Sequence, residues 1–353
     1  MEAPIKSRSR GRVADSVTIR DVARHASVAP MTVSRVINGA DSVRPKTRDR
    51  VNASIQALNY IPSNAARSLA ATGDIRVGLL YSNPSSAYLS ELLMGALEQA
   101  GTENVQLIVN RFDSGQTDLE SIAQFIRRRT DGIVVPAPLC DRRDVHELLS
   151  EAEVPAVLLA ANDPSYEFHA VRIDDHSAAR RMTQHLLQSG HRRIGFILGN
   201  PQHGSSFRRL SGYRDALAQY EVAFDEAMVR SGLFTYRSGF EAAEELLALP
   251  GRPTAVFASN DDMAAGAVGA AHRRGFDVPR DLSVVGFDDT AMATAIWPEL
   301  TTIRQPIADM AGRAIEMLVE TIRQRRTGES GPVRHEILPY RLVQRESDAP
   351  PSS

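Results

Sequence analysis

Apolar residues follow two different patterns along the chain, and the pattern changes near Asp74. Between residues 18 and 72 they recur three or four positions apart, which predicts four amphipathic helical segments. After Asp74, short continuous apolar runs alternate with amphipathic stretches. The runs are Val77–Tyr81, Val105–Val109, Gly132–Val135, Pro155–Leu159, Ile194–Leu198, Ala255–Ala258 and Ser283–Phe287. Continuous apolar strands separated by helices indicate parallel sheets that are covered on both faces.

The segment from Thr18 to Gly39 has the pattern of two short helices joined by a tight connection, a helix-turn-helix. Thr18 and Asp21 predict a capping box for the first helix, and Pro30 suits the first turn of the second. The side chains predicted to be buried are Ile19, Val22, Ala23, Val33, Val36 and Ile37. Those left outside the core are Pro30, Met31, Ser34, Arg35 and Asn38. An exposed helix face that carries an arginine suits the major groove of DNA.

These residues resemble the DNA-binding headpiece of the lac repressor (LacI/GalR) family, in which a TVSRVxN recognition helix follows an xxDVAxxAxVS segment. The resemblance runs without gaps for about 60 residues, through Arg44–Arg48, Leu58–Pro62 and Ala65–Ala70. Two positions depart from the family. Ala29 replaces the usual helix-capping serine, a loss of roughly 0.5–2 kcal/mol at a helix end, and Ser27 replaces the usual turn glycine. Neither departure removes the contact surface.

Phrases along the rest of the chain resemble the same family. They are His191–Gly195, Arg209–Tyr213, Ala258–Asp261, Ser283–Asp289 and Pro298–Ile303. The resemblance implies an α/β protein, with an N-terminal all-α helix-turn-helix headpiece and a two-lobed body with parallel sheets, like a periplasmic sugar-binding protein. Three crossovers would join the lobes, and an effector would bind in the cleft between them, where the carboxyl ends of the strands gather.

The expected boundaries follow from these patterns. Residues 1–16 are expected to form a disordered basic tail, residues 17–61 the headpiece, and residues 62–73 a hinge helix with its linker. The body is expected to span residues 74–345. Its first lobe would comprise about 74–173 and 304–333, and its second lobe about 174–303 and 334–345. Residues 346–353 are polar and rich in Pro and Ser, and we expect them to be disordered.

Charge is divided unevenly between the two regions. Residues 1–72 hold 12 Lys and Arg against 5 Asp and Glu, a balance of +7, whereas the remaining residues carry −9. A basic head on an acidic body is typical of a phosphate-binding module attached to a domain that does not bind nucleic acid. The single cysteine, Cys140, cannot form an internal disulfide, and no run approaches the length of a membrane span. The lone cysteine fits a reducing cytoplasm, and we expect a cytoplasmic protein that associates with the nucleoid through its DNA-binding headpiece.

The resemblance assigns roles to residues of the headpiece. Arg35 would read guanine O6 and N7, a contact worth about 1–3 kcal/mol of discrimination, and the apolar Pro30 and Met31 would touch thymine methyl groups. The residues expected to position phosphates are Thr18, Thr32, Ser34, Asn38, Thr47 and Tyr60. In the hinge segment, Leu69 matches the family's lever residue, which wedges open a central step from the minor groove, and Ala66 lines the same face.

The resemblance also places effector contacts in the body. They are Asn83, Tyr88, Ser205, Arg209, Phe234, Asn260 and Asp288. Two alternatives stay open here, since Asp289 could be a helix cap and Arg209 could pair with Asp288. Ala160 stands where the lac repressor has an aspartate, so a galactoside-type contact is missing. Tyr88 resembles the purine repressor, but His203 stands where that protein has a basic group, so a sugar or glycoside is favoured over a purine.

Three functions compete on the sequence. The first is an effector-controlled repressor; the alternative within this class is a purine-type regulator that needs a co-repressor. The second is a sugar-binding receptor, which the basic headpiece and the absence of a signal-peptide pattern disfavour. The third is an enzyme built on His169, Asp174, Asp175 and His176, but their spacing matches no known site and no GxxxxGK[ST] phosphate loop is present. We therefore expect no catalytic residue, no metal and no cofactor.

The expected partners are a pseudo-palindromic double-stranded DNA operator, a small-molecule effector and a second copy of the chain. A headpiece that reads one half-site must be paired, so the protein should be a homodimer. Tetramers of the family form through a leucine-heptad tail, whereas Arg345–Pro351 contains no heptad and two prolines, which stop a helix. We expect no membrane partner.

Overall fold

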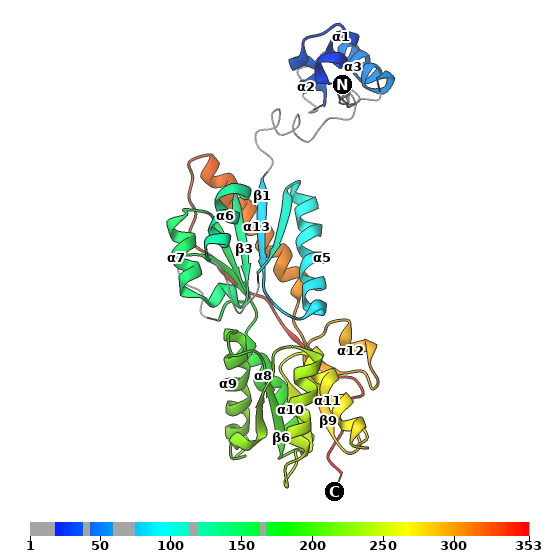
Figure 1. Cartoon of the computed structure of the whole chain (residues 1–353), viewed down its shortest axis with the longest axis vertical. Coiled ribbons are helices and arrows are strands. Elements are labelled where there is room, and N and C mark those ends of the chain that lie inside the picture. The colour runs from blue at the N-terminus through cyan, green and yellow to red at the C-terminus, as the bar shows by residue number, and fades with distance from the viewer. Residues whose placement is uncertain (1–17, 38–42, 59–74, 113–118, 163–166, 353) are drawn as a thin grey trace, which may run out of the picture. The chain divides into compact units, whose positions relative to one another are not determined.

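The computed structural model describes residues 18–37, 43–58, 75–112, 119–162 and 167–352, and Figure 1 shows its elements. The chain divides into two compact units, Met1–Asp74 and Ile75–Ser353. This division falls where the hydrophobic pattern changes. The expected N-terminal tail and the expected hinge helix at 62–73 lie outside the described residues. None of the helices in the described ranges combines the length and the apolar composition that a bilayer crossing requires.

The described part of the first unit contains α1 (Ile19–His25), α2 (Pro30–Ile37) and α3 (Pro45–Ala57). Their common core consists of Val22, Ala23, Ala26, Val33, Val36, Val43 and Val51. The carboxylate of Asp21 accepts hydrogen bonds from the backbone N–H and the hydroxyl of Thr18, at 3.0 and 2.6 Å, which is the expected capping box. The predicted helix-turn-helix is confirmed.

The turn between α1 and α2 explains why the family usually has a glycine there. Ser27 adopts a φ of 50°, in the left-handed region of backbone conformation. Glycine reaches this region without steric cost, whereas a residue with a Cβ pays roughly 1–2 kcal/mol. The turn geometry is therefore kept in this chain although the residue that favours it is absent.

The first lobe of the body is built on a parallel sheet of six strands in the order β11-β5-β4-β3-β1-β2. The strands are β1 (Arg76–Tyr81), β2 (Gln106–Arg111), β3 (Gly132–Pro136), β4 (Ala156–Leu159), β5 (His169–Arg172) and β11 (His335–Ile337). The helices are α5 (Ser86–Glu103), α6 (Leu119–Arg129), η1 (Leu139–Asp141), α7 (Arg143–Glu151) and α13 (Ile307–Arg326). Along β3, Val134 packs with the α5 and α13 side, while Ile133 and Val135 pack with α6 and α7. The sheet is therefore covered on both faces, as predicted.

The second lobe repeats this plan with the strand order β12-β10-β9-β8-β6-β7, in which only the β10–β12 pair is antiparallel. The strands are β6 (Ile194–Leu198), β7 (Val229–Ser231), β8 (Ala255–Ala258), β9 (Ser283–Asp288), β10 (Thr301–Arg304) and β12 (Arg341–Val343). The helices are α8 (Asp175–Gln188), α9 (Gly204–Gln219), η2 (Glu226–Met228), α10 (Tyr236–Leu247), α11 (Asp261–Arg273) and α12 (Met292–Ala295). Helices α8 and α9 pack together, and so do α10 and α11 (Figure 1).

The chain passes between the lobes three times, after β5, after β10 and after β11. One expected boundary needs correction. We expected residues 334–345 to belong to the second lobe, but His335, Glu336 and Ile337 pair with β5 of the first lobe. The chain enters the second lobe only after this strand, because β11 completes the edge of the first sheet before β12 completes the other.

The C-terminal residues also differ from the expectation of disorder at 346–353. Ser347 is fully buried, its hydroxyl donates to the Val284 carbonyl, and it accepts from the Thr301 N–H at 2.9 Å. The carboxylate of Asp348 lies 2.7 Å from Nε2 of His185 on α8. The Ala349 carbonyl accepts from the Ser283 hydroxyl at 3.0 Å. This segment is a fixed part of the second lobe as far as residue 352, because its polar groups find partners that lie far away in the sequence.

The His185–Asp348 pair predicts a pH-dependent contribution to stability. Burial raises the pKa of Asp348, but hydrogen bonding, first of all with His185, outweighs burial and leaves this pKa below its usual value. A depressed pKa stabilises the fold above the unfolded value of about 3.9, and this stabilisation is lost as the pH falls through the folded pKa. Asp348→Asn should therefore lower the stability of the body by about 1–3 kcal/mol at pH 7 and by much less near pH 3.

The matched control is Asp215→Asn, because Asp215 makes a contact of the same length, 2.7 Å, with His176 but is exposed. An exposed pair contributes at most about 1 kcal/mol. Thermal unfolding of both variants at pH 7 and near pH 3 provides the measurement. Equal losses in the two variants, or a loss in Asp348→Asn that persists at low pH, would contradict the assignment.

Candidate functional site

One pocket between the lobes collects all the side chains that the sequence assigned to the effector. The seven are Asn83, Tyr88, Ser205, Arg209, Phe234, Asn260 and Asp288. The same pocket is lined by Ser85, Ala137, Ala160, His203 and Gln305. They come from segments that follow strands in both lobes, where ligands gather in parallel α/β sheets. Gln305, which directly follows β10, was not predicted.

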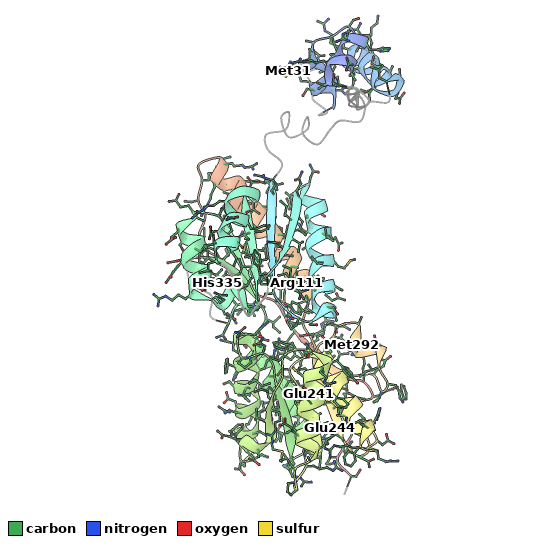
Figure 2. The ribbon with its side chains drawn as sticks, in the orientation of Figure 1. Met31, Arg111, Glu241, Glu244, Met292 and His335 are labelled. Atoms are coloured by element: carbon green, nitrogen blue, oxygen red, sulfur yellow. The ribbon has the colours of Figure 1, made fainter. Side chains whose placement is uncertain are left out.

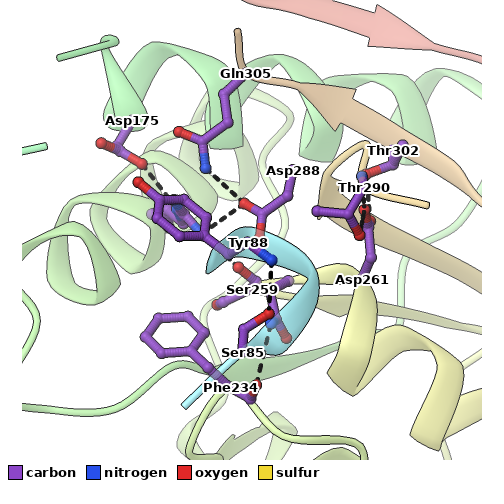
Figure 3. A network of polar contacts seen from close by, with 12 residues as sticks. Ser85, Tyr88, Asp175, Phe234, Ser259, Asp261, Asp288, Thr290, Thr302 and Gln305 are labelled. Atoms are coloured by element: carbon purple, nitrogen blue, oxygen red, sulfur yellow. Dashed lines mark hydrogen bonds and ion pairs between the residues drawn. The ribbon is translucent and has the colours of Figure 1, made fainter. Parts of the chain in front are cut away.

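Arg209 is the central charge of this pocket. It lies on α9, is only 5% exposed, and its Nε donates to the Asp175 carboxylate at 2.8 Å. One terminal nitrogen donates to the Ser259 carbonyl and lies 3.9 Å from Asp288 (Figure 3). The guanidinium also stacks 3.6 Å from the centre of the Phe287 ring. The pairing of Arg209 with Asp288, left open by the sequence, is therefore present beside a shorter pairing with Asp175.

Asp288 ends β9 and faces the pocket with one neutral donor bound to it. Gln305 donates to its carboxylate at 2.6 Å (Figure 3). Burial raises the pKa of Asp288 to about 7, and the charge of Arg209 works against this rise. Its neighbour Asp289 points elsewhere and holds Arg304 and Arg345 in ion pairs. Asp289 is thus a structural group, and Asp288 is the carboxylate that a ligand would meet.

Two asparagine side chains that were expected to bind the ligand already form hydrogen bonds with the backbone. The side-chain oxygen of Asn260 accepts from the Met263 N–H at 3.0 Å and caps α11, and its nitrogen donates to the Phe234 carbonyl at 3.3 Å. The side-chain oxygen of Asn83 accepts from the Ser85 N–H at 2.9 Å. Both side chains line the pocket, but Asn260 retains less hydrogen-bonding capacity for a ligand than Asp288 does, because its nitrogen also donates to Asp262.

The aromatic wall of the pocket is formed by Phe234, which is 5% exposed and has a φ of 59°. The ring of His203 packs against it with 5.0 Å between ring centres. Tyr88 faces them from the first lobe, and burial raises its pKa above the usual value, so it stays a neutral phenol. The pocket therefore offers apolar ring faces beside a small number of polar groups, the mixture that sugar-sized ligands need.

Three polar contacts cross the cleft directly. Ser85 donates to Asp262 at 2.5 Å, the Gly204 N–H donates to Asp141 at 2.9 Å, and Arg208 donates to the Asn162 carbonyl at 3.2 Å. A Cβ at position 204 would come within 2.1 Å of Cβ of Asn162, so only glycine permits this approach. The cavity that remains measures about 30 Å³, roughly the volume of one water molecule. The three contacts therefore hold the lobes together beside a small pocket.

The polar residues considered as an enzyme site do not form one. Nε2 of His169 lies 3.2 Å from the Thr321 hydroxyl, the Asp174 carboxylate caps α8, and Asp175 is engaged by Arg209. His176 pairs with Asp215. Each of the four is thus held by a different partner, and nothing in their arrangement brings an acid and a base to one point.

On the headpiece, the side chains of α2 that were expected to read DNA differ in exposure. Pro30 and Arg35 are exposed, and Met31, which is 65% exposed, projects from the helix (Figure 2). Thr32 and Ser34 are half-buried on the same helix, and Thr47 is half-buried on α3. Thr18 is exposed at the start of α1. Asn38, Tyr60, Ala66 and Leu69 lie outside the described residues.

Comparison with known proteins agrees with the two kinds of domain in the chain. The family model of bacterial regulatory proteins of the lacI family matches residues 18–63, and that of the periplasmic binding protein-like domain matches residues 183–347. Catabolite control protein A of Priestia megaterium is 34% identical over 334 residues, which cover 94% of this chain and 99% of that protein. The transcriptional regulator GalR of Escherichia coli is 37% identical over 303 residues, which cover 85% of this chain and 88% of GalR.

Solved structures agree over the full length. The lac repressor dimer bound to operator and the anti-inducer ONPF superposes with a TM-score of 0.82 at 29% identity, covering 95% of this chain and 100% of that one. The complex of the transcriptional regulator CelR with cellobiose gives a TM-score of 0.71 at 32% identity, and the match covers 94% of this chain and 99% of the CelR chain. A helix-turn-helix joined to a two-lobed body with a polar cleft defines a DNA-binding transcriptional regulator and not an enzyme. The chain belongs to the lacI family of bacterial regulatory proteins.

Proposed function

We propose that this protein is a repressor whose affinity for its operator is set by a sugar or glycoside bound between the lobes. The observation that carries the proposal is the meeting of seven side chains, each expected at a different position of the sequence, around one interlobe pocket. The solved CelR complex contains cellobiose, which supports a carbohydrate over a purine. The protein would act in the cytoplasm at the nucleoid.

In this proposal the exposed face of α2 enters the major groove. Arg35 would bond guanine O6 and N7, and Met31 and Pro30 would contact thymine methyl groups. The phosphate contacts would come from Thr18, Thr32, Ser34, Asn38, Thr47 and Tyr60, which fix the register without reading the sequence. Ala66 and Leu69 would enter the minor groove from the hinge segment.

The cleft supplies the two states that control requires. Three chain crossings let the lobes rotate against each other while they stay joined, and the contacts of Ser85, Asp141 and Arg208 hold the closed state. A ligand shifts this equilibrium by its difference in affinity for the open and closed forms. Asp288 and Arg209 would bond ligand hydroxyl groups, and Phe234 would cover the apolar face of a sugar ring.

We further propose that two copies pair through one side of the body; the solved lac repressor complex, which this chain resembles, is also a dimer. Met94 and Leu97 on α5 are 67% and 56% exposed, and Trp297 is 74% exposed. Met94 and Leu97 lie one turn apart on α5, and adjoining exposed apolar side chains are typical of a surface that a partner covers. A second copy of this chain is the occupant that a two-fold operator requires.

The base-reading role of Arg35 gives a first test. Arg35→Ala should weaken binding to the operator by about 10- to 100-fold, because one bidentate base contact is lost. Binding to random DNA should change little and keep its salt dependence, since the phosphate contacts remain. Fluorescence anisotropy with operator and scrambled duplexes measures both quantities. Equal losses on the two duplexes would show that Arg35 only contacts phosphate.

The effector role of the cleft gives a second test. Asp288→Asn keeps an oxygen for Gln305 to bond but removes the charge, so it should lower the effector response at least 10-fold and leave operator binding intact. The control is Asp277→Asn, which makes the same chemical change at an exposed ion pair with Arg280. Operator release is titrated against the ligand found in a thermal-shift screen of sugars, glycosides and purines. An unchanged response in Asp288→Asn would remove this residue from the site.

The assembly gives a third test. Light scattering of the purified protein should give the mass of two chains at micromolar concentration, and the double change Met94→Glu with Leu97→Glu should give one. Val333→Glu, which places the same charge at another exposed apolar position, should leave the dimer intact. A mass of four chains for the unchanged protein, or a dimer that survives the double change, would refute the proposed assembly.

A further inference from the structure

The charges around the pocket are unbalanced. Among the described residues that line it, Arg209 is the one side chain with a permanent positive charge. This charge is already shared between Asp175 at 2.8 Å and Asp288 at 3.9 Å. A third carboxylate, Asp262, reaches the pocket edge through its hydrogen bond with Ser85. Burial raises the pKa of Asp288 to about 7, so at pH 8 this carboxylate is ionised and the local balance is negative before any ligand enters.

Helix N-termini usually offset such an imbalance, because their free N–H groups attract anions. Here the helices α9, α10 and α11 of the second lobe begin at the cleft, and side chains of the protein accept hydrogen bonds from N–H groups in their first turns. Asp141 accepts from the Gly204 N–H at the start of α9, and the Thr235 hydroxyl accepts from the Ser238 N–H at the start of α10. Asn260 caps α11, whose first turn also carries Asp262. At each of these helix starts a group of the protein itself already takes part of the positive end of the dipole, which leaves less of it for an incoming anion.

His203 is the remaining group that could supply a positive charge. It is 2% exposed, and burial, assisted by the charge of Arg209, lowers its pKa to about 4. It is therefore a neutral imidazole at physiological pH. Its Nε2 atom is buried and has no hydrogen-bond partner among the described residues, although the ring is fixed against Phe234. A buried polar nitrogen without a partner costs free energy that a bound group would recover.

We propose that the cleft selects an uncharged polyhydroxyl ligand and rejects its anionic counterparts, with His203 as the specificity-determining residue that bonds a ligand hydroxyl through Nε2. This inference rests on the proposed function and names the charge class of the effector. A phosphate or carboxylate in this pocket would face uncompensated carboxylates in a poorly screened interior. At a separation of about 6 Å, such repulsion weakens binding on the order of 100-fold. A neutral polyhydroxyl ligand pays no such penalty, and its hydroxyl groups can donate to Asp288 and bond Nε2 of His203, which line the same pocket.

The test compares matched ligands on the full-length protein at pH 8. D-glucose, D-galactose and cellobiose are each titrated beside an anionic counterpart, namely glucose 6-phosphate, galacturonate and cellobionate, by thermal shift and calorimetry. We expect at least one neutral sugar to bind and its counterpart to bind about 100-fold more weakly. An anionic member that binds as tightly as its neutral partner, or binds alone, overturns the charge selection but leaves an effector site in place. Binding by neither class overturns the sugar site on which both proposals rest.

Variants of His203 test its own role. His203→Ala should weaken the neutral sugar at least 10-fold, whereas His203→Gln, which keeps a neutral hydrogen-bonding group, should recover most of that loss. His203→Lys places a cation at the same point and should improve binding of the anionic counterpart at least 10-fold relative to the unchanged protein. Operator binding in the absence of ligand reports whether each variant is folded. Unchanged sugar affinity in a folded His203→Ala variant refutes the assignment, and the ligand comparison stands on its own if a variant does not fold.

Discussion

The structure of the second lobe around the cleft depends on a buried guanidinium. An isolated buried charge is very costly, so Arg209 can occupy its place on α9 only where opposite charges and carbonyl groups reach it. Asp175 arrives from the start of α8, the Ser259 carbonyl from the end of β8, and Asp288 from the end of β9. One ion thus fixes the relative positions of two helices and two strand ends. The same arrangement leaves Asp288 as the group that can still accept a ligand hydroxyl.

The sequence could predict this site because strong apolar runs mark where buried parallel strands end. Asn260 and Asp288 follow such runs, and the carboxyl edge of a sheet brings them together. It could not predict that the amide of Asn260 is used to cap α11, because a cap and a ligand contact call for the same residue type. Gln305 was not predicted as a pocket residue, because the preceding strand β10 (Thr301–Arg304) is too polar to be recognised as a buried apolar run.

Other parts of the fold lie beyond local pattern. Strands β7, β11 and β12 have three residues each and are partly exposed. They are therefore too short to be predicted from alternating apolar and polar residues or from a continuous apolar run. The C-terminal segment has the composition of a disordered tail, yet Ser347 and Asp348 are fixed by Val284, Thr301 and His185. The composition of a segment indicates whether it can form a buried core by itself. Here the hydrogen-bond partners that fix the segment lie more than 40 positions away in the sequence.

The positions of β11 and β12 near the C-terminus have a consequence for the order in which the parts of the protein fold during synthesis. The helix-turn-helix is made of neighbouring segments within residues 18–58 and can form as soon as they leave the ribosome. Neither sheet of the body is complete until β11 and β12, at residues 335–343, have been synthesised. During translation there is therefore an interval in which a DNA-reading module exists without the ligand-sensing body. In the proposed dimer, a single headpiece on a nascent chain reaches only one half of an operator. The lack of a partner therefore limits DNA binding during this interval.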